Sequence, residues 1–263
     1  MAGFLDVAMA AARAGGKVLQ NLLPGDRAIA SKGTRIDLVT DADRQAEDAI
    51  VACIRSHFPD DAILSEERGA EAGRSPYRWI VDPLDGTTNY AHRFPVYAVS
   101  VAVEAGGQVL AGAVYDPTRD ELFAARRGMG ASLNGHRLRV SQETDLGEAL
   151  LATGFPYNIA TNPRNNLKQF ADLCRRARAV RRPGSAALDL CYVAAGRLDG
   201  YWELTIEVWD VAAGALILEE AGGRMSRVNG SAYDILCGEL VATNGKIQGA
   251  LVAALQESLR TPS

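Results

Sequence analysis

Three runs rich in β-branched residues, joined by short turns, restrict the fold of this chain more than any other feature of its sequence. The runs are VYAVSVAVE (96–104), QVLAGAVYD (108–116) and ELFAAR (121–126). Gly106-Gly107 separates the first two runs, and Asn134-Gly135 marks a further hairpin. Consecutive strands joined by short turns pair as an antiparallel meander. Because helical patterns precede these runs, we expect helices layered on an antiparallel sheet.

The segments before the meander predict two helices and one strand. Apolar residues recur at helical spacing over residues 4–11 and again over 40–57, where Thr40 and Asp43 form a candidate capping pair. The N-terminal segment lacks a basic start, so we interpret it as an amphipathic helix and not as a signal peptide. The run WIVDP predicts a strand that stops at Pro83.

After residue 145 strands and helices alternate. Strands are expected at 149–155, 198–204 and 239–245. Helices are expected at Leu167–Arg178, between a capping Ser185 and Gly196, before Gly222-Gly223, and at the C-terminal end. The predicted fold class is therefore α+β, with an antiparallel sheet in residues 1–145 and a smaller mixed sheet in residues 146–263. No flexible linker separates the halves, so we expect one compact unit.

Composition and charge exclude several classes of protein. The 263 residues are 48% hydrophobic, which is enough for a buried core, and the net charge of −4 argues against a broad nucleic-acid-binding surface. No apolar run approaches the ~20 residues that a membrane-spanning helix needs. The cysteines form no CxxC pair, so we expect buried apolar groups in a reducing cytoplasm: Cys53, Cys174, Cys191 and Cys237.

Acidic residues stand at three places where an apolar segment gives way to a turn or a helix. Glu66 follows AILS, Asp82 and Asp85 end WIVDPLD, and Asp210 precedes a helix of small residues. Elements that end at one edge of a layered fold can converge there. No basic residue lies within or beside DPLDG, so converged carboxylates need hard divalent cations. Oxygen ligands favour Mg²⁺, and the scarcity of histidine and cysteine disfavours zinc.

The residues that follow Asp85 suit a phosphate group. Gly86-Thr87-Thr88 is expected to begin a helix, and the free backbone N–H groups at a helix N-terminus bind anions. The alternatives for this stretch alone are a calcium loop or a surface turn. An EF-hand is excluded because its alternating ligands and terminal glutamate are missing. The three acidic places together favour a Mg²⁺–phosphate site.

Several of these motifs closely resemble the inositol monophosphatase family, part of the Mg²⁺-dependent, lithium-sensitive sugar phosphatases. The resemblance covers nearly the whole chain, and its motifs are DLVTDAD (37–43), SEE (65–67), DPLDGTTN (82–89), HRFP (92–95), GSAALDLCYVAAGRLDGYWE (184–203) and WDVAAGALILEEAGG (209–223). It implies a layered α/β/α/β/α sandwich. It also implies a cytoplasmic, homodimeric phosphoric monoester hydrolase that is inhibited by lithium and acts on myo-inositol monophosphates.

The resemblance further implies a role for each matching residue. It implies one Mg²⁺ held by Glu66, Asp82 and the backbone carbonyl of Leu84, a second held by Asp82, Asp85 and Asp210, and a loosely held third at Glu66. Thr87, hydrogen-bonded to Asp43, would position the attacking water with help from Glu66. The backbone of Gly86, Thr87 and Thr88 would hold the phosphate.

The substrate pocket is implied in the same way. Its residues would be Asp85, Gly184, Ser185, Ala186, Glu203 and Asp210, and Lys32 and Glu67 match further polar positions near the metals. Hydrolysis in such a site is in line and forms no covalent intermediate.

Two alternatives to an inositol monophosphatase stay open. Relatives hydrolyse fructose 1,6-bisphosphate, 3′-phosphoadenosine 5′-phosphate or histidinol phosphate, and Glu207, if it faced the pocket, would disfavour highly anionic substrates. Some bacterial members also bind RNA polymerase or RNA-processing assemblies. A basic cluster could serve that contact or could lie on a solvated helix or a dimer interface: Arg175, Arg176, Arg178, Arg181 and Arg182.

Overall fold

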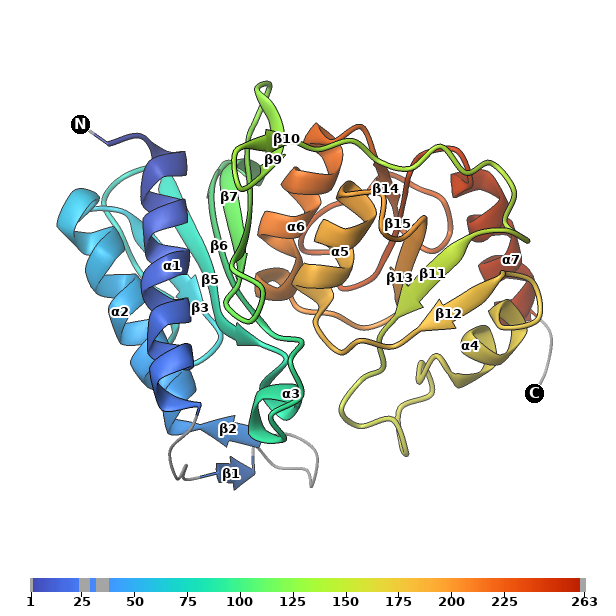
Figure 1. The fold of residues 1–263 in the computed structure, drawn as a ribbon, viewed down its shortest axis with the longest axis horizontal. Coiled ribbons are helices and arrows are strands. Elements are labelled where there is room, and N and C mark those ends of the chain that lie inside the picture. Colours follow the sequence, from blue (N-terminus) through green and yellow to red (C-terminus); the bar gives the residue numbers. More distant parts are fainter. Residues whose placement is uncertain (1, 24–28, 32–37, 261–263) are drawn as a thin grey trace.

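The computed structural model describes residues 2–23, 29–31 and 38–260, and its helices and sheets alternate in layers (Figure 1). Helices α1 (Phe4–Leu22) and α2 (Asp41–His57) cover one face of the larger sheet. Helices α5 (Ala186–Ala194) and α6 (Val208–Glu220) fill the space between the two sheets. Helices α4 (Leu167–Leu173) and α7 (Gln248–Arg260) cover the outer face of the smaller sheet. This layering confirms the predicted α+β class.

The larger sheet has the order β10-β9-β8-β7-β6-β5-β3-β4 among the described residues. Its strands are β3 (Ala62–Ser65), β4 (Gly69–Glu71), β5 (Tyr77–Asp85), β6 (Ala98–Ala105), β7 (Gln108–Asp116), β8 (Glu121–Arg126), β9 (Gly130–Leu133) and β10 (His136–Arg137). All neighbours pair antiparallel except β3 and β5, which are parallel. The predicted meander of β6, β7 and β8 is confirmed. A separate antiparallel pair is formed by β1 (Ile29–Ser31) and β2 (Leu38–Thr40).

The smaller sheet has the order β12-β11-β13-β15-β14. Its strands are β11 (Leu150–Thr153), β12 (Ala179–Arg181), β13 (Gly200–Glu203), β14 (Arg224–Ser226) and β15 (Leu240–Thr243). Strand β11 pairs parallel with β12 and β13, whereas β15 pairs antiparallel with β13 and β14. This is the mixed sheet expected in the C-terminal half.

Two predicted boundaries were wrong, and tertiary pairing explains both. Strand β5 does not stop at Pro83 but continues to Asp85, with a register shift between Asp82 and Asp85. Proline lacks a backbone donor, and a bulge lets the strand continue around it. The helix expected to reach Arg178 ends at Leu173, because the backbone N–H of Arg178 donates to the Ala149 carbonyl as the chain turns towards β12.

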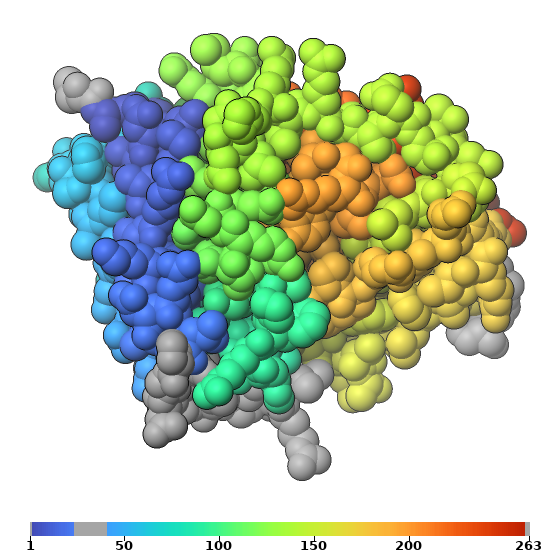
Figure 2. All heavy atoms as spheres, in the orientation of Figure 1, coloured from blue at the N-terminus to red at the C-terminus, as the bar shows by residue number. Residues whose placement is uncertain are grey.

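The main hydrophobic core lies between the two sheets and draws on both halves of the chain. Phe123 comes from the larger sheet, Leu190 and Leu216 from α5 and α6, and Tyr201 from the smaller sheet. In the space-filling view, the residues around 190 (orange) lie directly against the green residues of the larger sheet (Figure 2). Residues of both halves therefore share one hydrophobic core.

Two other expectations concern the whole chain. None of the described helices is both long enough and apolar enough to cross a membrane. The cysteines form no disulfides: Cys191 is buried, Cys53 and Cys237 are half-buried, and Cys174 is exposed. The prediction of a buried residue was therefore wrong for Cys174, which lies on the solvent side of the turn after α4.

Candidate active site

A pocket of about 400 Å³ opens where the end of β5 meets the N-terminal ends of α5 and α6. It gathers nearly all of the predicted site residues from distant parts of the sequence. Its lining includes Glu66, Asp82, Leu84, Asp85, Gly86, Thr87, Thr88, Gly184, Ser185, Ala186, Glu203 and Asp210. The folding of the chain therefore brings together the residues on which the family resemblance places metal, phosphate and substrate.

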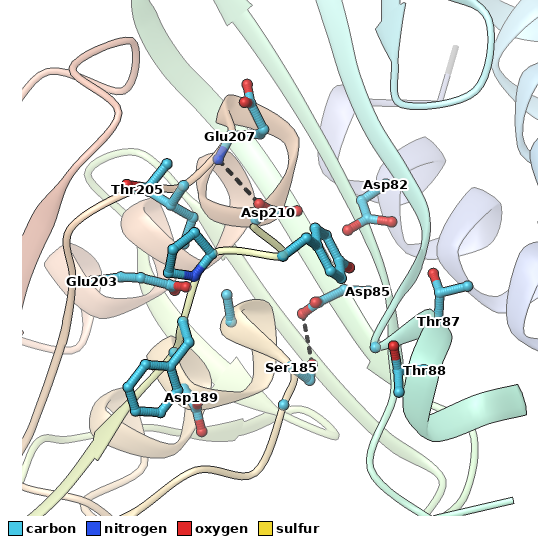
Figure 3. Close-up of a pocket in the computed structure, with 18 of the residues that line it drawn as sticks. Asp82, Asp85, Thr87, Thr88, Ser185, Asp189, Glu203, Thr205, Glu207 and Asp210 are labelled. Carbon is cyan, nitrogen blue, oxygen red and sulfur yellow. Dashed lines mark hydrogen bonds between the residues drawn. The ribbon is translucent and has the colours of Figure 1, made fainter. Parts of the chain in front are cut away.

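The acidic side of the pocket is shaped by the turn after β5. Gly86 has a φ of 97°, a conformation that residues with a Cβ atom rarely adopt. A Cβ atom there would also lie 3.0 Å from the Val96 carbonyl oxygen. The chain then enters the short helix α3 (Thr87–Ala91), and the Thr87 hydroxyl donates to the Leu84 carbonyl oxygen at 3.0 Å. The turn thus aims Asp85 and Thr87 into the same space (Figure 3).

The N-terminus of α5 holds Asp85 in place. Asp85 Oδ2 accepts hydrogen bonds from Ser185 Oγ at 2.6 Å and from the Ala187 backbone N–H at 2.7 Å. Ser185 is also the N-cap of α5, as predicted. These donors and the helix dipole favour the charged carboxylate. Burial has the larger effect, and it raises the pKa of Asp85 to about 6.

Asp82, Asp85 and Asp210 form a cluster suited to a cation. Each offers a carboxylate oxygen, and these oxygens lie within 4.8 Å of one another. Burial, followed by the neighbouring carboxylates, raises the pKa of Asp82 and of Asp210 well above its ordinary value. Asp82 Oδ2 is buried and accepts no hydrogen bond from any described residue. An orphaned carboxylate oxygen among three converging acids matches the oxygen ligands that Mg²⁺ takes.

Asp43 and Thr87 are the pair predicted to position the attacking water. Asp43 is fully buried at the start of α2, close enough to Asp82 to raise the pKa of that carboxyl group. The Asp43–Thr87 hydrogen bond stays a prediction. Glu67 lies 3.9 Å from Arg44 and outside the pocket lining, and Lys32 lies outside the described residues.

The far side of the pocket is a second polar region centred on Glu203. Tyr201 donates its hydroxyl to Glu203, and the two side chains share one face of β13. Gly154 packs so closely that a Cβ atom there would lie 2.2 Å from Glu203 Oε1. Burial raises the pKa of Glu203 to about 7. This carboxyl group is therefore held rigidly, away from the three clustered aspartates.

Other lining residues were not predicted from the sequence. They include Gly154, Phe155, Tyr157, Asp189 and Tyr201. Two signals could have found some of them. Tyr201 stands two residues before Glu203 in a strand, and Asp189 stands one helical turn after Ser185 in α5. No comparable signal in the sequence points to the loop that carries Phe155 and Tyr157.

Glu207 and Arg182 are among the residues that line the pocket, whereas the other arginines of the basic cluster are not. Glu207 is exposed, its backbone N–H donates to Asp210 Oδ2 at 3.1 Å, and its carboxylate points away from Asp210 in Figure 3. Its effect on substrate choice stays a prediction. In the cluster, Arg175 lies 3.4 Å from Asp172 and Arg176 lies 2.7 Å from Glu257. Arg178 pairs with Glu148, and Arg182 lines the pocket.

Comparisons with known proteins agree with this geometry. The model of the inositol monophosphatase family matches residues 1–260. The inositol-1-monophosphatase of Synechocystis sp. is 45% identical over 96% of this chain and 88% of its own. The Nus factor SuhB of Pseudomonas aeruginosa is 43% identical over 98% of both chains. The solved inositol monophosphatase from Anabaena (Nostoc) sp. superposes with a TM-score of 0.88 at 43% identity, covering 97% of this chain and 95% of that chain.

Proposed function

The chain belongs to the inositol monophosphatase family, and we propose that it hydrolyses myo-inositol monophosphates in a Mg²⁺-dependent reaction at the pocket between β5 and α6. Membership of the family makes the chain a phosphoric monoester hydrolase. The observation that carries the Mg²⁺ assignment is the cluster of Asp82, Asp85 and Asp210, with one buried carboxylate oxygen that no described residue satisfies.

The cations would be held by the carboxylates of Glu66, Asp82, Asp85 and Asp210 and by the Leu84 carbonyl. Bound there, they would lower the pKa of a water molecule and neutralise charge on the phosphate. Thr87 donates its hydroxyl hydrogen to Leu84 and keeps lone pairs that can accept a hydrogen bond from that water, which orients it for attack. Glu66 lines the same pocket, and its carboxylate would help to activate that water.

The rest of the chain positions the substrate. Ser185 and Ala187 fix Asp85, so the cluster keeps its shape while the substrate enters and the product leaves. Glu203 lies across the pocket and can accept hydrogen bonds from the hydroxyl groups of a polyol ring (Figure 3). A substrate without those hydroxyls would leave Glu203 without these additional hydrogen bonds. This arrangement favours inositol phosphates over simple phosphate esters.

A phosphate-release panel tests the substrate. It compares inositol 1-phosphate with fructose 1,6-bisphosphate, 3′-phosphoadenosine 5′-phosphate and histidinol phosphate, each with Mg²⁺. We expect the highest kcat/KM for inositol 1-phosphate. A higher kcat/KM for one of the other three would contradict the proposed substrate and would identify that compound as the preferred one.

Three further properties belong to the proposal. We expect inhibition by lithium, a homodimer and a cytoplasmic location. Lithium titration of the phosphatase assay, light scattering after gel filtration and cell fractionation test them separately. Failure of one leaves the other two standing.

A second role is suggested by the relatives named Nus factor SuhB, which match along the whole length of the chain. The basic cluster is the candidate contact with RNA polymerase, although three of its arginines are already paired with acidic side chains. A pull-down with purified RNA polymerase tests this role. Substitution of Arg175 and Arg181 by glutamate should abolish capture of RNA polymerase and leave the phosphatase activity unchanged. Undiminished capture of RNA polymerase by this variant would show that the basic cluster does not form the contact.

A further inference from the structure

Asp189 is a buried acid in the pocket wall that no part of the proposed metal site uses. It lies in the first turn of α5 and is only 2% exposed. Its Oδ1 atom is buried and has no hydrogen-bond partner among the described residues. It nevertheless lines the same pocket as Asp85 and Glu203. Asp189 is therefore part of the wall that a ligand in this pocket would contact.

The surroundings of Asp189 make the lack of a hydrogen-bond partner unfavourable in free energy. Burial and the charges of Asp85 and Glu203 raise its pKa well above the ordinary value, and Arg182 opposes that shift. Buried carboxyl groups in folded proteins are hydrogen-bonded in the great majority of cases, and an exception calls for an explanation. Apolar residues often stabilise a buried position as well as or better than charged ones do, so stability of the fold gives no reason for an acid at this position.

The position of Asp189 supplies the reason. In Figure 3 it lies on the same side of the pocket as Glu203, opposite Asp82 and Thr87. A phosphate bound at the aspartate cluster would direct the rest of its ester towards Asp189 and Glu203. We propose that Asp189 hydrogen-bonds a hydroxyl group of the polyol, so that Asp189 and Glu203 together recognise two hydroxyls of the substrate. This inference rests on the proposed function and extends it.

Two variants separate binding of a hydroxyl from a structural role. Asp189→Asn keeps the shape of the side chain, and Asp189→Leu removes its polar atoms. We expect Asp189→Leu to lower kcat/KM for inositol 1-phosphate by about 10-fold or more, mainly through KM. The same variant should change kcat/KM for p-nitrophenyl phosphate by no more than about twofold, because that ester has no hydroxyl to lose. Glu203→Gln is the matched control and should show the same selectivity.

Thermal stability provides the second readout. Removal of an unpartnered buried acid should leave the Tm of the ligand-free protein unchanged or raise it. A structural acid would give the opposite result, a lower Tm with equal losses of kcat/KM on both substrates. That result would overturn the assignment.

Monodeoxy analogues of inositol 1-phosphate identify the hydroxyl. One analogue should lack the hydroxyl that Asp189 binds. For this analogue, kcat/KM of the wild type should be much lower than for inositol 1-phosphate. In Asp189→Leu the difference between the two substrates should be small, because this variant cannot form the hydrogen bond with either of them. Equal losses in both proteins for every analogue would contradict the proposal. Wild-type protein that hydrolyses p-nitrophenyl phosphate but not inositol 1-phosphate would overturn the proposed substrate as well. Wild-type protein active on both, with Asp189→Leu unchanged on both, would overturn this assignment alone.

Discussion

At the level of single residues, the site contains some carboxylate oxygens that accept hydrogen bonds and others that have no hydrogen-bond partner among the described residues. Asp85 has two donors from α5, whereas Asp82 and Asp189 each keep a buried oxygen without a described partner. The satisfied group fixes the geometry of the pocket. The unsatisfied oxygens are available to a cation in one case and to a substrate hydroxyl in the other. The protein gives up some stability to keep them, as catalytic sites commonly do.

Thr87 tests the positioning of the water. Thr87→Ala should lower kcat by about 10²-fold with a smaller effect on KM, because a group that orients the water acts mainly in the transition state. Thr87→Ser keeps the hydroxyl and serves as the matched control. Steady-state kinetics on inositol 1-phosphate measures both variants. An alanine variant with a near-normal kcat would show that the water is oriented elsewhere.

At the scale of elements, helix N-termini and strand ends build the site. Helix α5 caps itself with Ser185 and holds Asp85 with the same side chain, and α6 places Asp210 in its first turn. Strand β5 delivers Asp82 and Asp85 through its register shift. The site therefore depends on how three elements meet.

Ser185 tests this dependence, because one hydroxyl serves a helix and the metal cluster together. Ser185→Ala should lower the free energy of unfolding by about 1 kcal/mol through loss of the cap. It should also weaken Mg²⁺ binding, since Asp85 loses its 2.6 Å donor. Ser185→Thr keeps both hydrogen bonds. Chemical denaturation and calorimetric titration with Mg²⁺ measure the two effects. Unchanged Mg²⁺ affinity in the alanine variant would contradict the prediction that Ser185 supports Asp85 as a Mg²⁺ ligand.

Local patterns in the sequence predicted helices and strands correctly where turn residues or hydrophobic periodicity determine their bounds. The strand at Glu121–Arg126 has the predicted bounds, and Gly196 follows the end of α5 with a positive φ of 68°. Tertiary pairing decided the places where prediction failed, such as the end of α4 at Leu173. The acidic motifs indicated the metal side of the pocket. The contact of Gly154 with Glu203 arises only when β11 and β13 pair, so no local pattern contains it.

At the scale of the whole molecule, the pocket lies where the two halves of the chain meet. Asp82 and Asp85 come from the larger sheet, and Glu203 and Asp210 come from the C-terminal half. Closing the fold therefore brings like charges together in a buried place. Ligand binding and folding stability are linked through these acids, because a cation bound by the folded state alone stabilises it.

This linkage predicts how pH changes the stability of the ligand-free protein. The pKa of Asp85 is raised from 3.8 to about 6, and that of Glu203 from 4.5 to about 7. The folded state therefore holds protons that the unfolded state has released. Their contribution is complete below the unfolded pKa values and is lost as pH rises through the folded ones.

Thermal melts between about pH 5 and about pH 8 measure this dependence. In chelator, the Tm should fall across this range, and added Mg²⁺ should restore more stability at the upper end than at the lower end. Carboxylates whose pKa is lowered by ion pairs, such as Glu121, are already charged in both states over this range and do not oppose the trend. A Tm in chelator that rises with pH would contradict the assignment of buried, proton-holding acids.

We propose that the carboxylate cluster of Asp82, Asp85 and Asp210 works as a Mg²⁺ site for phosphate ester hydrolysis. The most direct measurement is phosphate release from inositol 1-phosphate by chelator-treated protein as Mg²⁺ is added back. We predict no turnover in excess chelator, a saturable return with Mg²⁺, and almost no return in Asp82→Asn, whose orphaned oxygen is replaced. Full turnover in excess chelator, or an Asp82→Asn protein as active as the wild type, would contradict the account.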